Sequence, residues 1–226
     1  MVQVMAKKTD SEIQQDVLRE LKWDPRVEET DVGVEVDGAV VTLTGTLGSW
    51  GERVAAEEAA HRVRGVLDVA NDIVVRPPGT PGRTDTEIAR AVRSALVWDV
   101  FVPDERVQST VSDGVVTLKG VVDSWSQRDS ADRAIRNLAG VRAVLNKLEV
   151  KPPKVAAVDV RQAIEDALDR QAEREARQIR VEVRDSEVTL SGTVRSWAER
   201  QAAIGAAKGT PGVRSVQDGL RIEPYV

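Results

Sequence analysis

The chain has 226 residues, of which 41% are hydrophobic, and it carries a formal net charge of −5 at pH 7. This excess of acidic residues argues against nucleic acid as a partner, because binding to phosphate backbones depends on clustered Lys and Arg. The sequence has no cysteine, which excludes disulfides and thiolate metal sites. It also has no apolar run of the ~20 residues that span a membrane and no signal-peptide pattern at its start, so we expect a cytoplasmic protein.

The first predicted element is a helix. Residues 9–12 (TDSE) have the composition of a capping box. Ile13, Val17 and Leu21 then recur at helical spacing, and Pro25 ends the helix because the residue before a proline avoids helical angles.

A hairpin, a second helix and a third strand follow. Alternating valines over 32–36 predict a half-buried strand, and the dipeptide at 37–38 (DG) predicts a hairpin into a return strand. Ser49 opens the second helix as a capping residue, with a predicted buried stripe of Trp50, Val54, Ala59 and Val63. A third strand over 69–75 precedes a linker rich in proline and glycine.

The whole pattern occurs three times. The segment VTLTGTLGSWGER begins at Val41, VTLKGVVDSWSQR at Val116 and VTLSGTVRSWAER at Val188. We therefore predict an α+β protein of three tandem αββαβ modules over residues 9–76, 84–151 and 156–223. In each module a three-stranded mixed sheet carries two helices on one face, and its second and third strands run parallel because a helix connects them.

These residues resemble a known module. Val-Thr-Leu-x-Gly-x-Val-x-Ser, then a helix, then Gly-Val-x-x-Val-x-Asn/Asp-x-Leu/Ile-x-Val is similar to the BON domain family, and the likeness runs through all three units. The resemblance implies an αββαβ fold, no catalysis and no cofactor. It also implies a role in envelope or osmotic stress that is often attributed to phospholipid binding.

Each unit keeps a glycine and a tryptophan around the start of its second helix. The glycine lies between strand and helix, where it permits a bulge or a close backbone approach. The tryptophan follows the capping serine, and we interpret it as packing at the core or rim in preference to ligand contact. These residues are Gly45, Gly120 and Gly192, and Trp50, Trp125 and Trp197.

Each unit also keeps an arginine in the first turns of that helix, where a cation opposes the helix dipole. We expect an internal carboxylate or carbonyl partner more than a bound anion for Arg53, Arg128 and Arg200. Polar residues interrupt the third strand at Asn71, Asn146 and Asp218. We interpret them as bonded to local backbone, while a cation site built from such oxygens stays open. The family resemblance favours potassium as that ion.

The units differ most in the loop after the first helix. The third unit has a polar stretch at 170–175 that we expect to be helical, whereas the first has an aromatic residue at this place and the second has the most apolar loop in the chain. Two accounts stay open, because this apolar material either folds under the sheet or forms an exposed patch for membrane or partner contact. The residues concerned are Trp23 in the first unit and Trp98, Val100, Phe101 and Val102 in the second.

Catalysis is not expected. His61, the one histidine, is interpreted as a surface residue, and the carboxylates keep no fixed spacing across the units. The sequence therefore predicts a non-enzymatic stress protein that contacts a phospholipid surface or a protein partner. The alternatives are a sensor of a monovalent cation or small ligand, and a purely structural scaffold.

Overall fold

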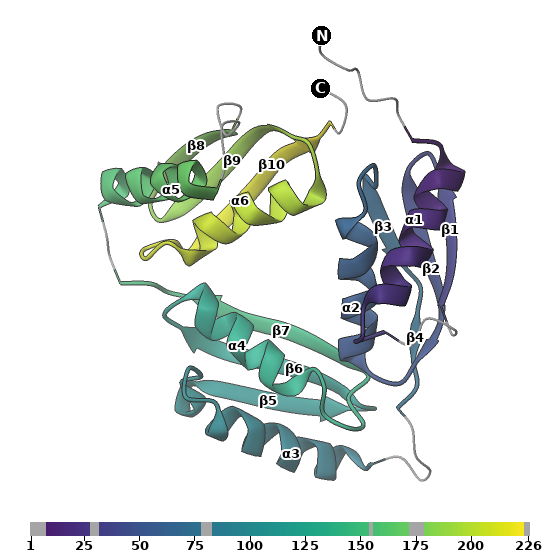
Figure 1. Ribbon diagram of the computed structural model, residues 1–226. Coiled ribbons are helices and arrows are strands. Elements are labelled where there is room, and N and C mark those ends of the chain that lie inside the picture. Colours follow the sequence, from purple (N-terminus) through teal and green to yellow (C-terminus); the bar gives the residue numbers. More distant parts are fainter. Residues whose placement is uncertain (1–7, 28–31, 78–82, 154–155, 172–178, 224–226) are drawn as a thin grey trace.

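The computed structural model describes residues 8–27, 32–77, 83–153, 156–171 and 179–223 (Figure 1). These residues form three modules, each with its own sheet and its own pair of helices. The predicted α+β architecture of tandem αββαβ units is confirmed. Among the described residues, no helix combines the length and the apolar character needed to cross a membrane.

The first module has an interrupted third strand. Strand β2 lies in the middle of its sheet, antiparallel to β1 and parallel to both β3 and β4. The predicted mixed sheet is thus present, with its last strand broken after Asn71. The elements are α1 (Asp10–Trp23), β1 (Val32–Asp37), β2 (Val40–Leu47), α2 (Trp50–Arg62), β3 (Asp68–Asn71) and β4 (Val74–Val75).

The second and third modules repeat this topology with a continuous third strand. In both, the middle strand pairs antiparallel with the strand before it and parallel with the strand after the helix. The second module contains α3 (Asp85–Trp98), a 3-10 turn η2 (Asp104–Arg106), β5 (Val107–Ser112), β6 (Val115–Val122), α4 (Trp125–Ile135) and β7 (Ala143–Val150). The third contains α5 (Ala157–Gln171), β8 (Ile179–Arg184), β9 (Glu187–Val194), α6 (Trp197–Gly209) and β10 (Ser215–Ile222).

Helix α5 ends at Gln171, so most of the polar stretch at 170–175, which we expected to be helical, lies outside the described residues.

Each module has its own core between the sheet and its two helices. In the first module α1 contributes Ile13, Val17 and Leu21 to the same buried cluster as Val41 and Leu43 of β2. Helix α2 joins this cluster through alanines, so both helices cover one face of the sheet as predicted. Alternate residues of β2 are buried, which is the pattern of a sheet packed on one side only.

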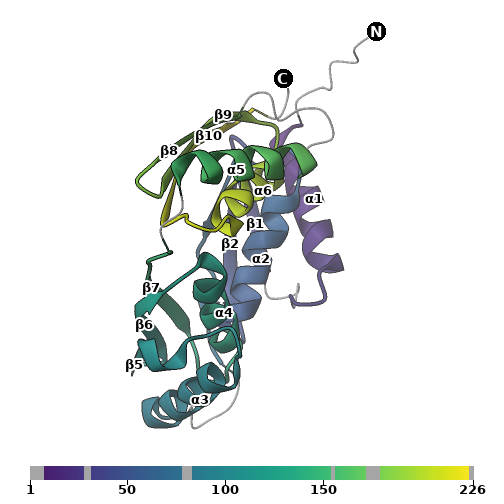
Figure 2. The same cartoon turned by 90° about the vertical axis from the view of Figure 1, so that its left-hand side faces the viewer.

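The predicted buried stripe of the second helix is partly wrong. Val54 and Trp50 are only half-buried, while Ala55, Ala60 and His61 are buried. The reason is that α2 packs on its own sheet and also on the other modules. Figures 1 and 2 show α2, α4 and α6 side by side in the middle of the molecule, with the three sheets outside them. A pattern read from one module does not contain this second contact.

Candidate functional site

An exposed apolar tip ends the first helix of the second module. Trp98 is 83% exposed, Val100 89% and Phe101 70%. Such large apolar side chains standing together in solvent are typical of a contact surface. We call these three residues the apolar tip.

The turn that carries the tip is held by its neighbours. The Asp99 carboxylate accepts a hydrogen bond from the Phe101 amide at 2.9 Å, and the Val102 amide donates to the Asp99 carbonyl at 3.1 Å. Val102 lies in the core at 6% exposure. This corrects its place in the predicted contact surface, because the Val102 side chain is buried in the core while Trp98, Val100 and Phe101 are exposed.

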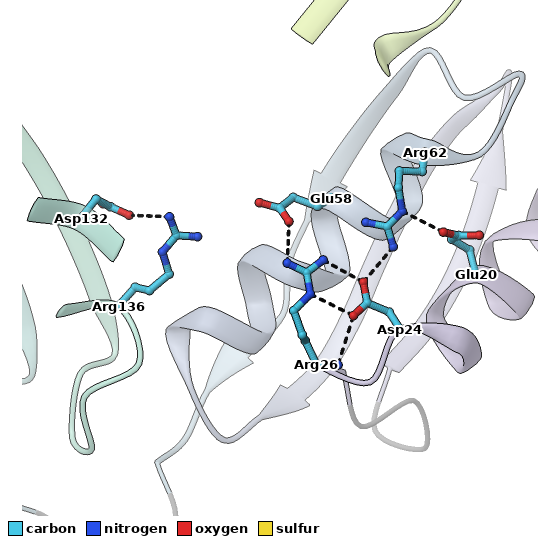
Figure 3. A network of polar contacts seen from close by, with 7 residues as sticks. All are labelled: Glu20, Asp24, Arg26, Glu58, Arg62, Asp132 and Arg136. Carbon is cyan, nitrogen blue, oxygen red and sulfur yellow. Dashed lines mark hydrogen bonds and ion pairs between the residues drawn. The ribbon is translucent and has the colours of Figure 1, made fainter. Parts of the chain in front are cut away.

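The first module uses the same turn with polar chemistry. Arg26 stands where the second module has Phe101, and its amide donates to Asp24 at 3.1 Å as the Phe101 amide donates to Asp99. The Arg26 guanidinium also donates to the Asp24 carboxylate at 2.8 Å and to Glu58 at 2.9 Å (Figure 3). An ion network thus occupies the position that is apolar in the second module.

Asp24 is the centre of that network. Its side chain is only 4% exposed, and Arg62 of α2 donates to it at 2.8 Å while also pairing with Glu20 (Figure 3). Hydrogen bonds from Arg26 and Arg62 hold the pKa of the Asp24 carboxyl far below its ordinary value. Asp24 therefore ties the end of α1 to α2 as an anion at neutral pH.

Trp23 is exposed like Trp98 but is not part of the same surface. Its side chain is 78% exposed at the end of α1. Figure 1 shows the C-terminal ends of α1 and α3 well apart from one another. The structure therefore does not bring Trp23 to the apolar tip. A pocket beside Trp23 is lined by charged groups that pair with one another, including Arg19 with Asp16 at 2.8 Å.

The glycines kept in all three units meet a steric requirement. Gly120 has φ 135°, and a Cβ there would lie 2.0 Å from the Arg106 carbonyl oxygen. Gly45 and Gly192 have φ 124° and 127°. The predicted close backbone approach is confirmed at Gly120, where the two strands of the hairpin come together.

The repeated arginines have internal partners, as predicted. The Arg128 guanidinium donates to the carbonyls of Leu148 and Asn146 at 3.2 and 2.8 Å. Arg53 makes the equivalent bonds to Ile73 and Asn71, and Arg200 donates to the Asp218 carboxylate at 2.7 Å. These contacts hold the start of each second helix against the third strand.

The polar residues of the third strand bond to local backbone, as predicted. Asn146 Oδ1 accepts from the Leu148 amide at 3.2 Å and Asp218 Oδ1 from the Leu220 amide at 3.0 Å. The carbonyls around Asn146 accept from Arg128, so the oxygens considered for a cation are already engaged. Within the described residues, no group of three or more His, Cys, Asp or Glu side chains is placed to hold a metal ion.

The helix-start tryptophans pack between modules. Trp50 packs against the core of the second module, and Lys208 of the third module lies 4.6 Å from the Trp125 ring centroid. His61 of the first module stacks on Trp197 of the third with ring centroids 4.1 Å apart. His61 is 7% exposed, so its interpretation as a surface residue is wrong. The missed signal is that the three equivalent positions all carry basic or imidazole side chains.

The BON domain family matches the chain three times, over residues 9–77, 84–152 and 157–224. The chain belongs to the BON domain family. It is 34% identical over 148 residues to the osmotically-inducible protein Y of Escherichia coli (strain K12), covering 63% of this chain and 73% of that protein. It is 25% identical over 129 residues to an uncharacterized protein in the gshII 5′ region of Anaplasma centrale, covering 56% and 85%.

Among solved structures, CdsD, a structural protein of the type III secretion system of Chlamydia trachomatis, aligns with 94% of this chain and 92% of its own. That alignment has 12% sequence identity and a TM-score of 0.27. The family match and the E. coli relative, which is named for osmotic induction, thus agree on the kind of protein that this chain resembles.

Proposed function

We propose that this BON protein is a non-enzymatic, stress-associated protein that docks on a phospholipid membrane surface through the apolar tip of its second module. The observation that carries the proposal is the exposure of Trp98 and Phe101, at 83% and 70%, on a turn that the first module closes with an ion network. The two modules share an exposed tryptophan at the end of the first helix, and only the second adds an exposed aromatic side chain, Phe101, where the first has Arg26.

The chemistry of the tip suits the boundary of a bilayer. Tryptophan is enriched at membrane–water interfaces because its ring is apolar and its N–H is polar. Burying two aromatic side chains supplies a few kcal/mol, which is enough for weak and reversible attachment.

Electrostatic attraction contributes little to such docking. The loop carries Asp99 and Asp104, and the nearby Arg93 already pairs with Asp104 at 2.7 Å. The whole chain has a net charge of −5. Binding should therefore come from apolar insertion and should survive moderate salt, whereas binding by a basic cluster is screened.

The stress association is supported by the relative that is named for osmotic induction. A membrane surface is also the ligand implied by the family resemblance of the sequence. We propose that the protein is cytoplasmic and binds the membrane surface reversibly.

Vesicle flotation tests the proposal. The full chain should float with vesicles of phosphatidylcholine alone and with vesicles that contain phosphatidylglycerol, with little change between low and moderate salt. The double variant W98S/F101S should lose most of this binding. A matched control is V74S/V158S, because Val74 and Val158 are also exposed, at 51% and 72%, but lie outside the tip.

Two results would overturn the proposal. One is that the parent protein floats with neither vesicle, which would leave the tip as a surface for a protein partner. The other is that W98S/F101S floats as well as V74S/V158S. W23S should have a smaller effect than the tip variant, since Trp23 lies apart from the tip.

A further inference from the structure

The second helices of the three modules share an unusual pair of ends. Each begins with tryptophan directly after its capping serine, and each has a basic or imidazole side chain at the equivalent place near its C-terminus. The pairs are Trp50 and His61 in α2, Trp125 in α4 and Arg136 directly after it, and Trp197 and Lys208 in α6. In two of the three cases the tryptophan that begins one helix contacts the basic or imidazole residue near the end of another.

The contact between the first and third modules is a ring stack. The His61 imidazole lies on the Trp197 indole with ring centroids 4.1 Å apart and planes 10° apart. These modules are not neighbours in the sequence, because the whole second module lies between them. The contact between His61 and Trp197 therefore does not follow from a short linker between adjacent modules.

The contact between the third and second modules repeats this geometry with a cation. Lys208 Nζ lies 4.6 Å from the Trp125 ring centroid, within the range of a cation–π interaction. Arg128 of the same helix covers the Trp125 ring at 5.2 Å. The end of α6 thus meets the start of α4, as the end of α2 meets the start of α6.

The contact between the second and first modules completes the series. Trp50 packs against the core cluster of the second module. The next residue, Gly51, lies so close to Asn137, the residue after Arg136, that a Cβ at Gly51 would be 1.6 Å from the Asn137 Oδ1. The end of α4 therefore meets the start of α2. Figure 3 shows Arg136, the residue after α4, with its guanidinium paired to Asp132 at 3.3 Å.

We propose that the second helices carry one repeated docking surface whose partner is another module of the same chain, and that its three uses close the chain into a ring clasped by His61 and Trp197. Head-to-tail contacts of this kind form either a closed ring or an open filament, depending on whether the rotation closes. Here three uses close, and the views in Figures 1 and 2 place α2, α4 and α6 around a common centre.

Among the described residues, three buried side-chain nitrogen atoms have no hydrogen-bond partner, and they lie at or next to these contacts. They are His61 Nδ1, Trp125 Nε1 and Arg136 Nε. His61 and Trp125 belong to two contacts between modules, and Arg136 directly precedes Asn137, which lies at the third, whereas the module cores are built of apolar side chains. A buried polar atom without a partner weakens a contact. At the ring contacts, these polar groups therefore offset part of the stabilisation that burial of the aromatic rings gives.

Proton NMR of the intact chain tests the clasp, because the sequence contains a single histidine. Stacking on an indole moves imidazole C–H signals upfield, so the His61 signals of the parent protein should lie upfield of those of a free histidine. In W197L this shift should be lost, although the change is made in the third module and the signal comes from the first.

Two further variants make the test specific. W197F keeps an aromatic ring under His61 and should keep most of the upfield shift. W125L removes the equivalent ring of another contact and should leave the His61 signals nearly unchanged. The proposal fails if the parent signals lie at free-histidine positions, or if W197L keeps the shift of the parent.

Discussion

Arg128 and Asn146 hold each other's main chain. The Arg128 guanidinium donates to the Asn146 carbonyl at 2.8 Å, and Asn146 Nδ2 donates back to the Arg128 carbonyl at 2.9 Å. The two residues lie on α4 and β7, so this pair fixes the helix start against the third strand. Arg53 and Asn71 repeat the reciprocal arrangement in the first module.

Replacing Asn146 with Ala should destabilise the second module. The change removes the two hydrogen bonds of the Asn146 side chain, to the Arg128 carbonyl and from the Leu148 amide, at a part-buried site where an unpaired group typically costs about 1–3 kcal/mol. Urea unfolding of the full chain measures the loss. The exposed residue Gln108 on β5 supplies the control Q108A, which should change the free energy of unfolding little. Equal free energies of unfolding for N146A and Q108A would show that the side-chain hydrogen bonds of Asn146 do not stabilise the module.

The capping serines should each contribute measurably. The hydroxyls of Ser49, Ser124 and Ser196 accept from the amide three residues on, at 3.1, 3.3 and 3.1 Å. Replacement of any one with Ala should cost about 1 kcal/mol in thermal or urea unfolding. S11A is the control, since Ser11 is an exposed residue inside the first turn of α1. Melting curves of S124A and S11A that coincide would contradict the capping role.

The Asp24 network should depend on pH with a definite sign. The pKa of Asp24 in the folded chain is lowered from 3.8 by its bonds to Arg26 and Arg62, so the folded state favours the anion. Its contribution to stability is therefore present above pH 3.8 and is lost as the pH falls below that value. D24N should lower the free energy of unfolding by about 2 kcal/mol at pH 7.

The difference in free energy of unfolding between D24N and the parent protein should become smaller as the pH falls below 3.8. Urea unfolding at a series of pH values measures it. E20Q is a matched control, because Glu20 pairs with the same Arg62 but its side chain is 39% exposed. A gap that stays constant with pH would show that the charge of Asp24 contributes nothing.

His61 should titrate below the ordinary histidine value of 6.5. Burial lowers its pKa, and Arg200 of α6 lowers it further, while Glu57 of α2 and Asp68 of β3 act to raise it. A group with a lowered pKa binds fewer protons when folded, so its contact is most stable above pH 6.5 and weakens as the pH falls below that value. NMR titration of the imidazole signals measures this pKa directly.

In W197L the pKa of His61 should rise toward 6.5, because loss of the stack exposes the imidazole to water. W125L should leave it near the value in the parent protein. A parent pKa at or above 6.5 would show that burial does not dominate, and that the Trp197 ring and the two carboxylates stabilise the imidazolium instead.

Local chemistry explains which features could be predicted from the sequence. The capping serines, the alternating strands and the partners of Arg128 depend on residues of one module, and three copies of that module repeat the signal. His61 was misplaced because its burial comes from Trp197, a residue of another module. Val102 was misplaced for a different reason. The three consecutive residues Val100, Phe101 and Val102 are all apolar or aromatic, so the sequence does not tell which of their side chains points inward.

The turn from Trp98 to Val102 contains side chains that should serve docking and a side chain that should serve folding, and mutations can separate the two roles. Trp98 and Phe101 are 83% and 70% exposed, so W98S/F101S removes little buried surface and should leave the melting temperature nearly unchanged. Val102 is 6% exposed in the core of the second module, so V102A should lower the free energy of unfolding by roughly 1–2 kcal/mol. Differential scanning calorimetry and vesicle flotation of both variants give opposite patterns if the tip docks, because W98S/F101S loses binding and V102A loses stability. A sharp fall in melting temperature for W98S/F101S, with unchanged binding per folded molecule, would instead assign the aromatic residues to the fold.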